Sequence, residues 1–175
     1  MKTILLLSFI FLFFLMENVA GQKQNDSIKT KPFKHGLGVA AGFSTGYGLS
    51  YRLFPNKFGI QLAFAPYMDD YESYYSFGFT FLYKIIETEF TNLFVYQGNH
   101  FYYSKYKSFD YTYMYPNYTF NQVEIVNKNW NNGIGLGIEF TILKRVSLNL
   151  MGGYAAYKNF KNIGFTGETA LFFKF

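Results

Sequence analysis

Few side chains in this sequence could act as nucleophiles, bases or metal ligands. The chain contains two histidines and no cysteine, which excludes disulfides, thiolate metal sites, a cysteine nucleophile and a lipidated cysteine. His35 stands near the start, whereas His100 comes four residues before Ser104. An even spacing puts His100 and Ser104 on one side of a β-strand, and a serine beside a histidine is a pair used in nucleophilic catalysis. What such a pair can do depends on the element that carries it.

Carboxylates gather once, in the stretch YMDDYE, which contains Asp69, Asp70 and Glu72. Oxygen-rich clusters can bind divalent cations, but these residues are not followed by a recognisable set of partner ligands. We therefore interpret them as solvated residues of a loop. The sequence predicts neither a metal site nor a cofactor.

The composition is unusual for a protein that folds in water. Half of the residues are hydrophobic, 23% are aromatic and 15% are charged, whereas a globular domain has roughly 25% charged residues. The net charge is +5, but the basic residues are scattered, and a nucleic-acid-binding surface would gather them on one face. This composition favours a barrel whose outside faces lipid and whose inside is polar.

The first residues, MKTILLLSFIFLFFLMENVAGQKQ, have the order of a secretory signal peptide. A positive charge at Lys2 precedes a short apolar run and then small residues, and the run is shorter than the roughly 20 residues of a spanning helix. We expect cleavage after Gly21, or alternatively after Ala20. The expected organisation is a signal peptide (1–21), a polar lead-in (22–35) and a barrel domain (36–175).

Beyond the lead-in, apolar residues alternate with small or polar ones. In NGIGLGIEFTI, isoleucine, leucine and phenylalanine share one face, and glycine, Glu139 and Thr141 share the other. A period of two predicts half-buried strands, and most are near the roughly 9–11 residues that cross a bilayer when tilted. In the fifth strand the phase is ambiguous, and we predict that Gln97 and Asn99 point inward. The expected strands are 36–43, 47–54, 58–66, 75–85, 91–103, 132–142, 146–157 and 165–175.

The connections between these strands alternate in length. Outer-membrane barrels have short periplasmic turns and longer outer loops, and a periplasmic N-terminus with eight strands puts every short turn on the periplasmic side except 44–46. Short turns are expected at 55–57, 87–89 and 144–145, and longer loops at 67–73, 104–131 and 158–164.

A soluble up-and-down barrel of lipocalin type is the main alternative to a membrane barrel. Such a barrel has an apolar interior and a polar exterior. Here each strand has one strongly apolar face and one small or polar face, and a narrow eight-stranded barrel with a glycine-rich inner face fits lipid outside better. We predict an all-β fold, a transmembrane antiparallel up-and-down barrel of eight strands.

The segment 104–131 allows two interpretations. Alternating tyrosines lead into Pro116-Asn117, and aromatic residues return after it, as in a hairpin. The hairpin could project as an aromatic outer loop, or it could supply two more wall strands and make ten. The likeness of YPNYTF to FPNKFG, a predicted periplasmic turn, favours ten, but we prefer eight. Tyrosine-rich loops can bind an extracellular ligand or lie at the lipid headgroups.

The signal peptide, the alternating strands, NLMGGYAAY and the final TGETALFFKF together resemble a small outer-membrane β-barrel of Gram-negative bacteria, of an uncharacterised kind found in Bacteroidetes. The resemblance implies a location in the outer membrane, contact with its lipids and insertion by the barrel assembly machinery. It also implies that Leu171, Phe173 and Phe175 form the assembly signal of the last strand.

Some eight-stranded barrels of this general class are lipid A deacylases, which place a serine two residues from a histidine on a lipid-facing strand. In this chain that position is Tyr102. The pattern therefore fails, and we interpret His100 as a surface or interfacial histidine.

Charged residues also fall on the inward faces of the expected strands. An eight-stranded lumen is just wide enough to be filled by side chains, and charges buried there must be paired. The small inner faces of 36–42 and 133–137 should leave room for a long basic side chain. We predict a luminal network that joins Arg52 to Glu139 and/or Glu168, with Lys84 at the periplasmic end.

These features favour a monomeric, non-enzymatic barrel with a filled lumen and a structural, adhesive or ligand-binding surface role. An enzyme acting on lipid A or phospholipid is one alternative. An accessory part of a secretion or envelope-assembly machine is another.

Overall fold

The computed structural model describes residues 33–175 except 70, 89, 115 and 116, and it describes side chains outside 109–122. The expected signal peptide and most of the lead-in therefore lie outside the described residues. No helix in the described ranges is long and apolar enough to cross a membrane.

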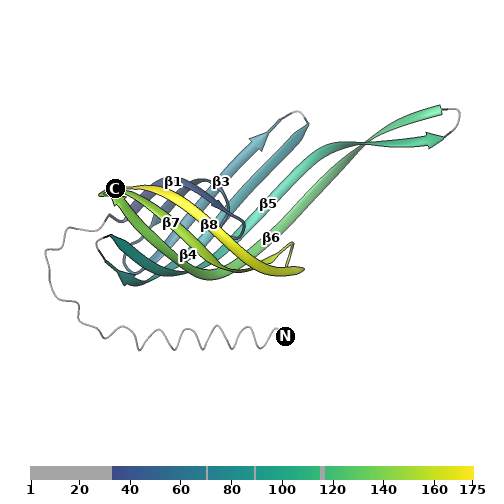
Figure 1. The fold of residues 1–175 in the computed structure, drawn as a ribbon. Coiled ribbons are helices and arrows are strands. Elements are labelled where there is room, and N and C mark those ends of the chain that lie inside the picture. Colours follow the sequence, from purple (N-terminus) through teal and green to yellow (C-terminus); the bar gives the residue numbers. More distant parts are fainter. Residues whose placement is uncertain (1–32, 70, 89, 115–116) are drawn as a thin grey trace. The chain divides into compact units, whose positions relative to one another are not determined.

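Eight antiparallel strands form one closed barrel, each paired with its neighbours in the chain and β8 paired with β1 (Figure 1). This confirms the expected architecture and excludes a ten-stranded wall. The strands are β1 (His35–Gly42), β2 (Gly48–Leu53), β3 (Phe58–Met68), β4 (Glu72–Glu87), β5 (Thr91–Met114), β6 (Asn117–Leu143), β7 (Val146–Tyr157) and β8 (Asn162–Lys174).

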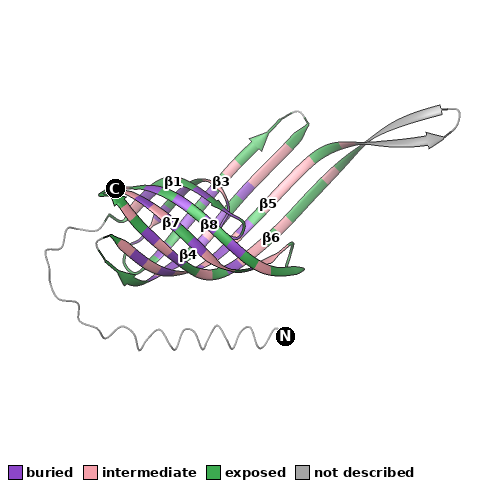
Figure 2. Cartoon of the chain, viewed as in Figure 1, coloured by how far each residue is buried: buried purple, intermediate pink, exposed green. Residues whose placement is uncertain are grey.

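Residues that alternate between apolar and polar or small in the sequence alternate between the outside and the inside of the barrel. Figure 2 shows buried and exposed residues in turn along the strands. In β3, Gln61 and Ala63 are buried, while Ile60, Leu62 and Phe64 are exposed on the outside. We define the outer wall as every second residue, facing outward, of the barrel strands. It contains no charged side chain within 37–41, 49–53, 58–66, 73–85, 91–103, 130–142, 146–156 and 163–173.

The barrel has two different ends. The base carries residues 33 and 175, the turns at 54–57 and 144–145, and residues 88 and 90 between β4 and β5. The backbone of His35 exchanges hydrogen bonds with Phe175 there. The opposite end, the mouth, carries the connections at 43–47 and 158–161 and, between β3 and β4, residues 69 and 71. The short turns therefore share one end, as their lengths predicted.

β5 and β6 continue far past the rest of the mouth as one paired ribbon (Figure 1). Their pairing runs without a shift from Thr91↔Phe140 to Met114↔Asn117. The segment 104–131 is therefore the outer part of a single hairpin. Lys105 Nζ and Glu124 Oε1, 2.5 Å apart, form an exposed ion pair across the ribbon.

The predicted phase of β5 was wrong. Gln97 and Asn99 face outward, and Phe94, Tyr96, Gly98 and His100 face the lumen. The outward amides satisfy one another: Gln97 Nε2 donates to Asn99 Oδ1 at 3.2 Å, and Asn132 Nδ2 donates to the same oxygen at 2.7 Å. Mutual hydrogen bonding lowers the cost of polar groups on an apolar wall, so polarity alone does not predict which way they face.

Candidate functional site

The β1–β2 connection, residues 43–47, folds into the lumen of the barrel. Ser44 and Thr45 are buried, and Gly46 and Gly48 adopt positive φ angles of 84° and 115°. Those angles suit glycine because it has no Cβ, so the two glycines allow the chain to turn inward and return to β2. A connection expected to be a short outer turn is thus an internal plug, which we call the plug loop.

Glu168 on β8 anchors the plug loop through hydrogen bonds. Its carboxylate accepts hydrogen bonds from the hydroxyls of Ser44 and Thr45, from the Ser44 backbone N–H at 3.2 Å and from Thr166 Oγ1 at 3.1 Å. Several donors compensate the loss of hydration of a buried carboxylate. The sequence placed Glu168 in the lumen; the structure brings it to the plug loop, and no contact with Arg52 occurs among the described contacts.

His100 on β5 is a second anchor of the plug loop. Its Nδ1 lies 2.9 Å from the Phe43 carbonyl oxygen, and Asn131 Nδ2 donates to the same oxygen at 3.0 Å. Its Nε2 lies 2.9 Å from Ser76 Oγ, which in turn contacts the backbone of Tyr47. His100 is only 2% exposed, so its interpretation as a surface histidine was wrong.

The serine partner of His100 is therefore Ser76, not Ser104. Sequence spacing could not find this pair, because the two residues meet across β4 and β5, where Gly78 is opposite His100. Ser76 is fully buried, and the other imidazole nitrogen faces a carbonyl oxygen in place of a carboxylate. A nucleophile needs access to its substrate and an oriented base, so this geometry suits loop anchoring.

Three inward glycines make room for the plug loop. A Cβ built on Gly78 would collide with the Thr45 carbonyl oxygen, one on Gly98 would lie 2.6 Å from the Ser44 carbonyl oxygen, and one on Gly133 would lie 2.6 Å from Ser44 Cβ. The small inner face near 133 was predicted to receive a basic side chain. It receives the plug loop instead, because Ser44 occupies the space that a side chain at 133 would need.

Above the plug loop, the mouth opens into a pocket of about 710 Å³. This volume is in the usual range of small-molecule sites. The lining comes from the plug loop and from β4 to β8: Phe43, Tyr47, Tyr74, His100, Tyr102, Asn129, Asn131, Tyr157, Lys158 and Asn162.

Aromatic rings in the mouth pocket support one another. Tyr74 packs edge-on against Tyr102 with centroids 4.9 Å apart and lies 5.7 Å from the ring of Tyr47. Tyr47 also meets the imidazole of His100 edge-on at 5.3 Å. Rings held at these separations gain from mutual packing, so the aromatic wall is ordered before any ligand arrives.

The rim at the β7–β8 turn is strained and clamped. Lys158, Asn159 and Phe160 have φ angles of 51°, 59° and 66°, and left-handed backbone is costly for residues other than glycine. Asn159 compensates by hydrogen bonding with β6: it donates to the Trp130 and Lys128 carbonyls at 3.0 and 3.2 Å, and its Oδ1 accepts from Trp130 N at 3.0 Å. The clamp fixes Lys158 at the edge of the pocket.

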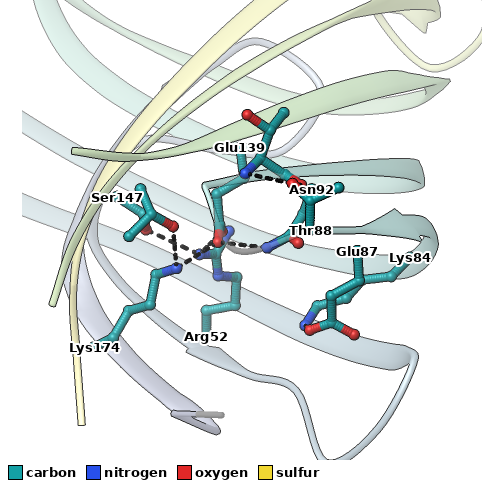
Figure 3. A network of polar contacts seen from close by, with 10 residues as sticks. Arg52, Lys84, Glu87, Thr88, Asn92, Glu139, Ser147 and Lys174 are labelled. Atoms are coloured by element: carbon teal, nitrogen blue, oxygen red, sulfur yellow. Dashed lines mark hydrogen bonds and ion pairs between the residues drawn. The ribbon is translucent and has the colours of Figure 1, made fainter. Parts of the chain in front are cut away.

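A second polar cluster lies near the base (Figure 3). Arg52 forms an ion pair with Glu139, and Lys174 Nζ lies 2.6 Å from the second oxygen of the same carboxylate. Asn92 Nδ2 also donates to Glu139, at 3.1 Å. The Arg52 guanidinium lies 4.2 Å from the centroid of the Phe172 ring. We call these residues the base cluster.

Lys84 is inward but does not join the base cluster. Its Nζ lies 2.6 Å from Glu87 Oε1 and 4.7 Å from the ring centroid of Phe54. Of the four predicted luminal charges, the structure brings Arg52 and Glu139 together and gives Lys84 and Glu168 other partners. The residues of the predicted assembly signal, Leu171, Phe173 and Phe175, are all exposed, with the first two on the outer wall.

The described residues contain no group of three or more His, Cys, Asp or Glu side chains that could hold a metal ion. Asp69 and Glu72 flank the β3–β4 turn, where the Asp69 N–H donates to the Glu72 carbonyl at 2.7 Å. Asp70 lies outside the described residues.

No protein-family description and no curated protein sequence matches this chain. Several solved structures are similar at low identity. The N-terminal β-barrel domain of Pseudomonas aeruginosa OprF is 13% identical over 81% of this chain and 96% of that chain, with a TM-score of 0.46. Neisserial surface protein A is 15% identical over 81% and 94%, with a TM-score of 0.41. The attachment invasion locus protein Ail of Yersinia pestis is 15% identical over 82% and 95%, with a TM-score of 0.40.

Proposed function

We propose that this protein is an integral outer-membrane barrel that is closed to flow and presents a ligand-binding mouth to the outside of the cell. The observation that carries the proposal is the contrast between the two faces of the barrel. The outer wall has no charged side chain within the strand ranges given above, whereas the lumen buries Arg52, Glu139 and Glu168. An uncharged outer surface is compatible with contact to hydrocarbon, and charges inside the lumen are stable there only when they are paired.

A binding role is favoured over a channel because polar and apolar groups fill the lumen at both ends. The plug loop occupies the mouth side, and the base cluster packs around Phe172, which is fully buried. What the mouth leaves open is a pocket with ordered aromatic walls. The buried position of Ser76 supports a role without catalysis.

The proposed orientation can be tested with single cysteines, because the chain has none of its own. Lys161→Cys places a thiol in the β7–β8 turn at the mouth, and Lys144→Cys places one in the β6–β7 turn at the base; both positions are exposed. Intact cells are treated with a membrane-impermeant maleimide, and the protein is then isolated from the outer-membrane fraction.

We expect labelling of Lys161→Cys in intact cells, and labelling of Lys144→Cys only after lysis. A folded barrel should also migrate differently on gels before and after heating. Labelling of the base cysteine alone, or recovery of the protein from the soluble fraction, would overturn the proposal.

A further inference from the structure

The lining of the mouth pocket carries positive charge and no negative charge. Lys158 is the only fully charged residue in its lining, which contains no carboxylate. Among the described residues, Lys158 Nζ has no ion-pair partner, and its backbone N–H is held by Asn131 Oδ1 at 3.1 Å. The clamp therefore positions the backbone of Lys158 at the edge of the pocket and leaves its ammonium exposed and unpaired. An unpaired ammonium there favours an anionic group and opposes a cationic one.

Polar groups without internal partners also line the pocket. The amides of Asn129 and Asn162 and the hydroxyls of Tyr47, Tyr74 and Tyr102 make no side-chain hydrogen bond within the described part of the chain. Asn131 differs, because both ends of its amide are used to hold the plug loop and the rim. The free amides can each donate and accept, so they suit a ligand with several hydroxyl groups.

The combination of these features selects one ligand class. Tyrosine rings offer a flat apolar face with a polar tip, which matches a pyranose ring whose faces carry C–H groups and whose edge carries hydroxyls. A single lysine acts as a point charge and suits a ligand that carries an isolated anionic group, such as the carboxylate of a sugar acid. The pocket volume of about 710 Å³ accommodates more than one sugar unit.

We propose that the mouth pocket binds an acidic saccharide, with the carboxylate at Lys158, the hydroxyls at Asn129 and Asn162, and the sugar face against Tyr74 and Tyr102. The clamp of Asn159 on β6 and the strained rim serve this site, because they hold the backbone of Lys158 beside the pocket while its ammonium has no salt bridge that a ligand would have to break. This inference rests on the proposed function, since a glycan reaches the site in the cell only if the mouth faces outward.

The test uses the purified, folded barrel in detergent, so its outcome does not depend on orientation in the cell. Isothermal titration calorimetry compares trigalacturonate with neutral galactotriose. The probing variant is Lys158→Gln, and the matched control is Lys161→Gln, an exposed lysine of the same turn that does not line the pocket. Asn162→Ala tests hydroxyl recognition at constant charge.

We expect saturable binding of trigalacturonate that weakens about tenfold in Lys158→Gln, equivalent to about 1.4 kcal/mol, and is unchanged in Lys161→Gln. Asn162→Ala should weaken both sugars. Equal weakening by the two lysine variants would mean general charge attraction and would overturn the proposal. So would equal affinity for the neutral sugar, or no saturable binding by a barrel that retains its heat-dependent gel shift. A negative result here leaves the outward-facing mouth to be judged by cysteine labelling.

Discussion

At the scale of single residues, we expect substitutions in the base cluster to lower the unfolding free energy by different amounts. Glu139 faces two cations, and replacing it with glutamine leaves the charges of Arg52 and Lys174 close together in the lumen. Breaking a buried ion pair from one side costs about 3–5 kcal/mol. We expect Glu139→Gln to lower the unfolding free energy by about this amount, measured by urea titration in lipid vesicles.

Lys174→Gln should cost less, about 1–3 kcal/mol, because Arg52 still neutralises Glu139 and Lys174 is partly exposed. The control is Glu124→Gln, which removes an exposed ion pair with Lys105 on the β5–β6 ribbon. Solvent screens such pairs, so no measurable change is expected. Equal losses in Glu139→Gln and Glu124→Gln would show that the base cluster does not stabilise the barrel.

The sequence predicted which charges point inward and that Arg52 meets Glu139, but it did not identify the partners of Glu168. Arg52, Lys84, Glu139 and Glu168 were all predicted inward because their neighbours alternate, and all four are buried. The partner of Glu168 depends on a loop that folds into the lumen, which no periodicity encodes. The inner glycines Gly78, Gly98 and Gly133 were the available signal, since a run of missing side chains on one face implies that something else fills the space.

At the scale of elements, the plug loop depends on Gly78. A methyl group at this position would meet the Thr45 carbonyl oxygen and lie 2.9 Å from Gly46 Cα. Backbone atoms cannot yield as a flexible side chain can, so we expect Gly78→Ala to displace the plug loop from the lumen. In a Ser44→Cys background, the thiol should be unreactive with a polar maleimide, and Gly78→Ala should make it reactive.

The matched control is Gly167→Ala. Gly167 belongs to a strand of the same barrel, but a Cβ there has no atom within 4 Å, so the loop thiol should stay protected. Full protection in both backgrounds would show that the plug loop does not require the glycine at 78.

The β5–β6 ribbon is predicted to be dispensable for the barrel. The pair Ser104↔Asn127 lies an even number of positions from Met114↔Asn117, so it has the same hydrogen-bonding type. A variant that joins Ser104 to Asn127 through Asn-Gly should therefore form a normal hairpin. We expect an unchanged gel shift on heating and unchanged saccharide affinity, because Tyr102 and Asn129 remain. Loss of folding would show that the ribbon takes part in barrel assembly.

The length of these two strands was hard to predict for a physical reason. The alternation that marks a strand in the barrel wall continues past Tyr103, and a ribbon needs only its own pairing to persist. Nothing local marks the point where lipid contact ends. The side chains of 109–122 lie outside the described ones, so an aromatic surface on this ribbon stays a prediction.

At the scale of the whole molecule, two closures lie in series along the lumen. The plug loop occupies the mouth side, with Glu168 and His100 as anchors. The base cluster and Phe172 occupy the other side. An eight-stranded barrel is just wide enough to be filled by side chains, so each closure should be sufficient to stop ion flow alone.

This arrangement predicts a non-additive effect on conductance in planar bilayers. The unmodified barrel should show no steady conductance, and neither should Gly78→Ala or Phe172→Ala alone, because one closure remains in each. The double variant should leak with small fluctuating currents, since both closures are lost and the remaining polar side chains, such as Gln61 and Asn149, favour water in the lumen. Folding of the double variant is checked by its gel shift before recording. A large steady current through the unmodified barrel, or an equal leak in either single variant, would show that the closures do not act in series.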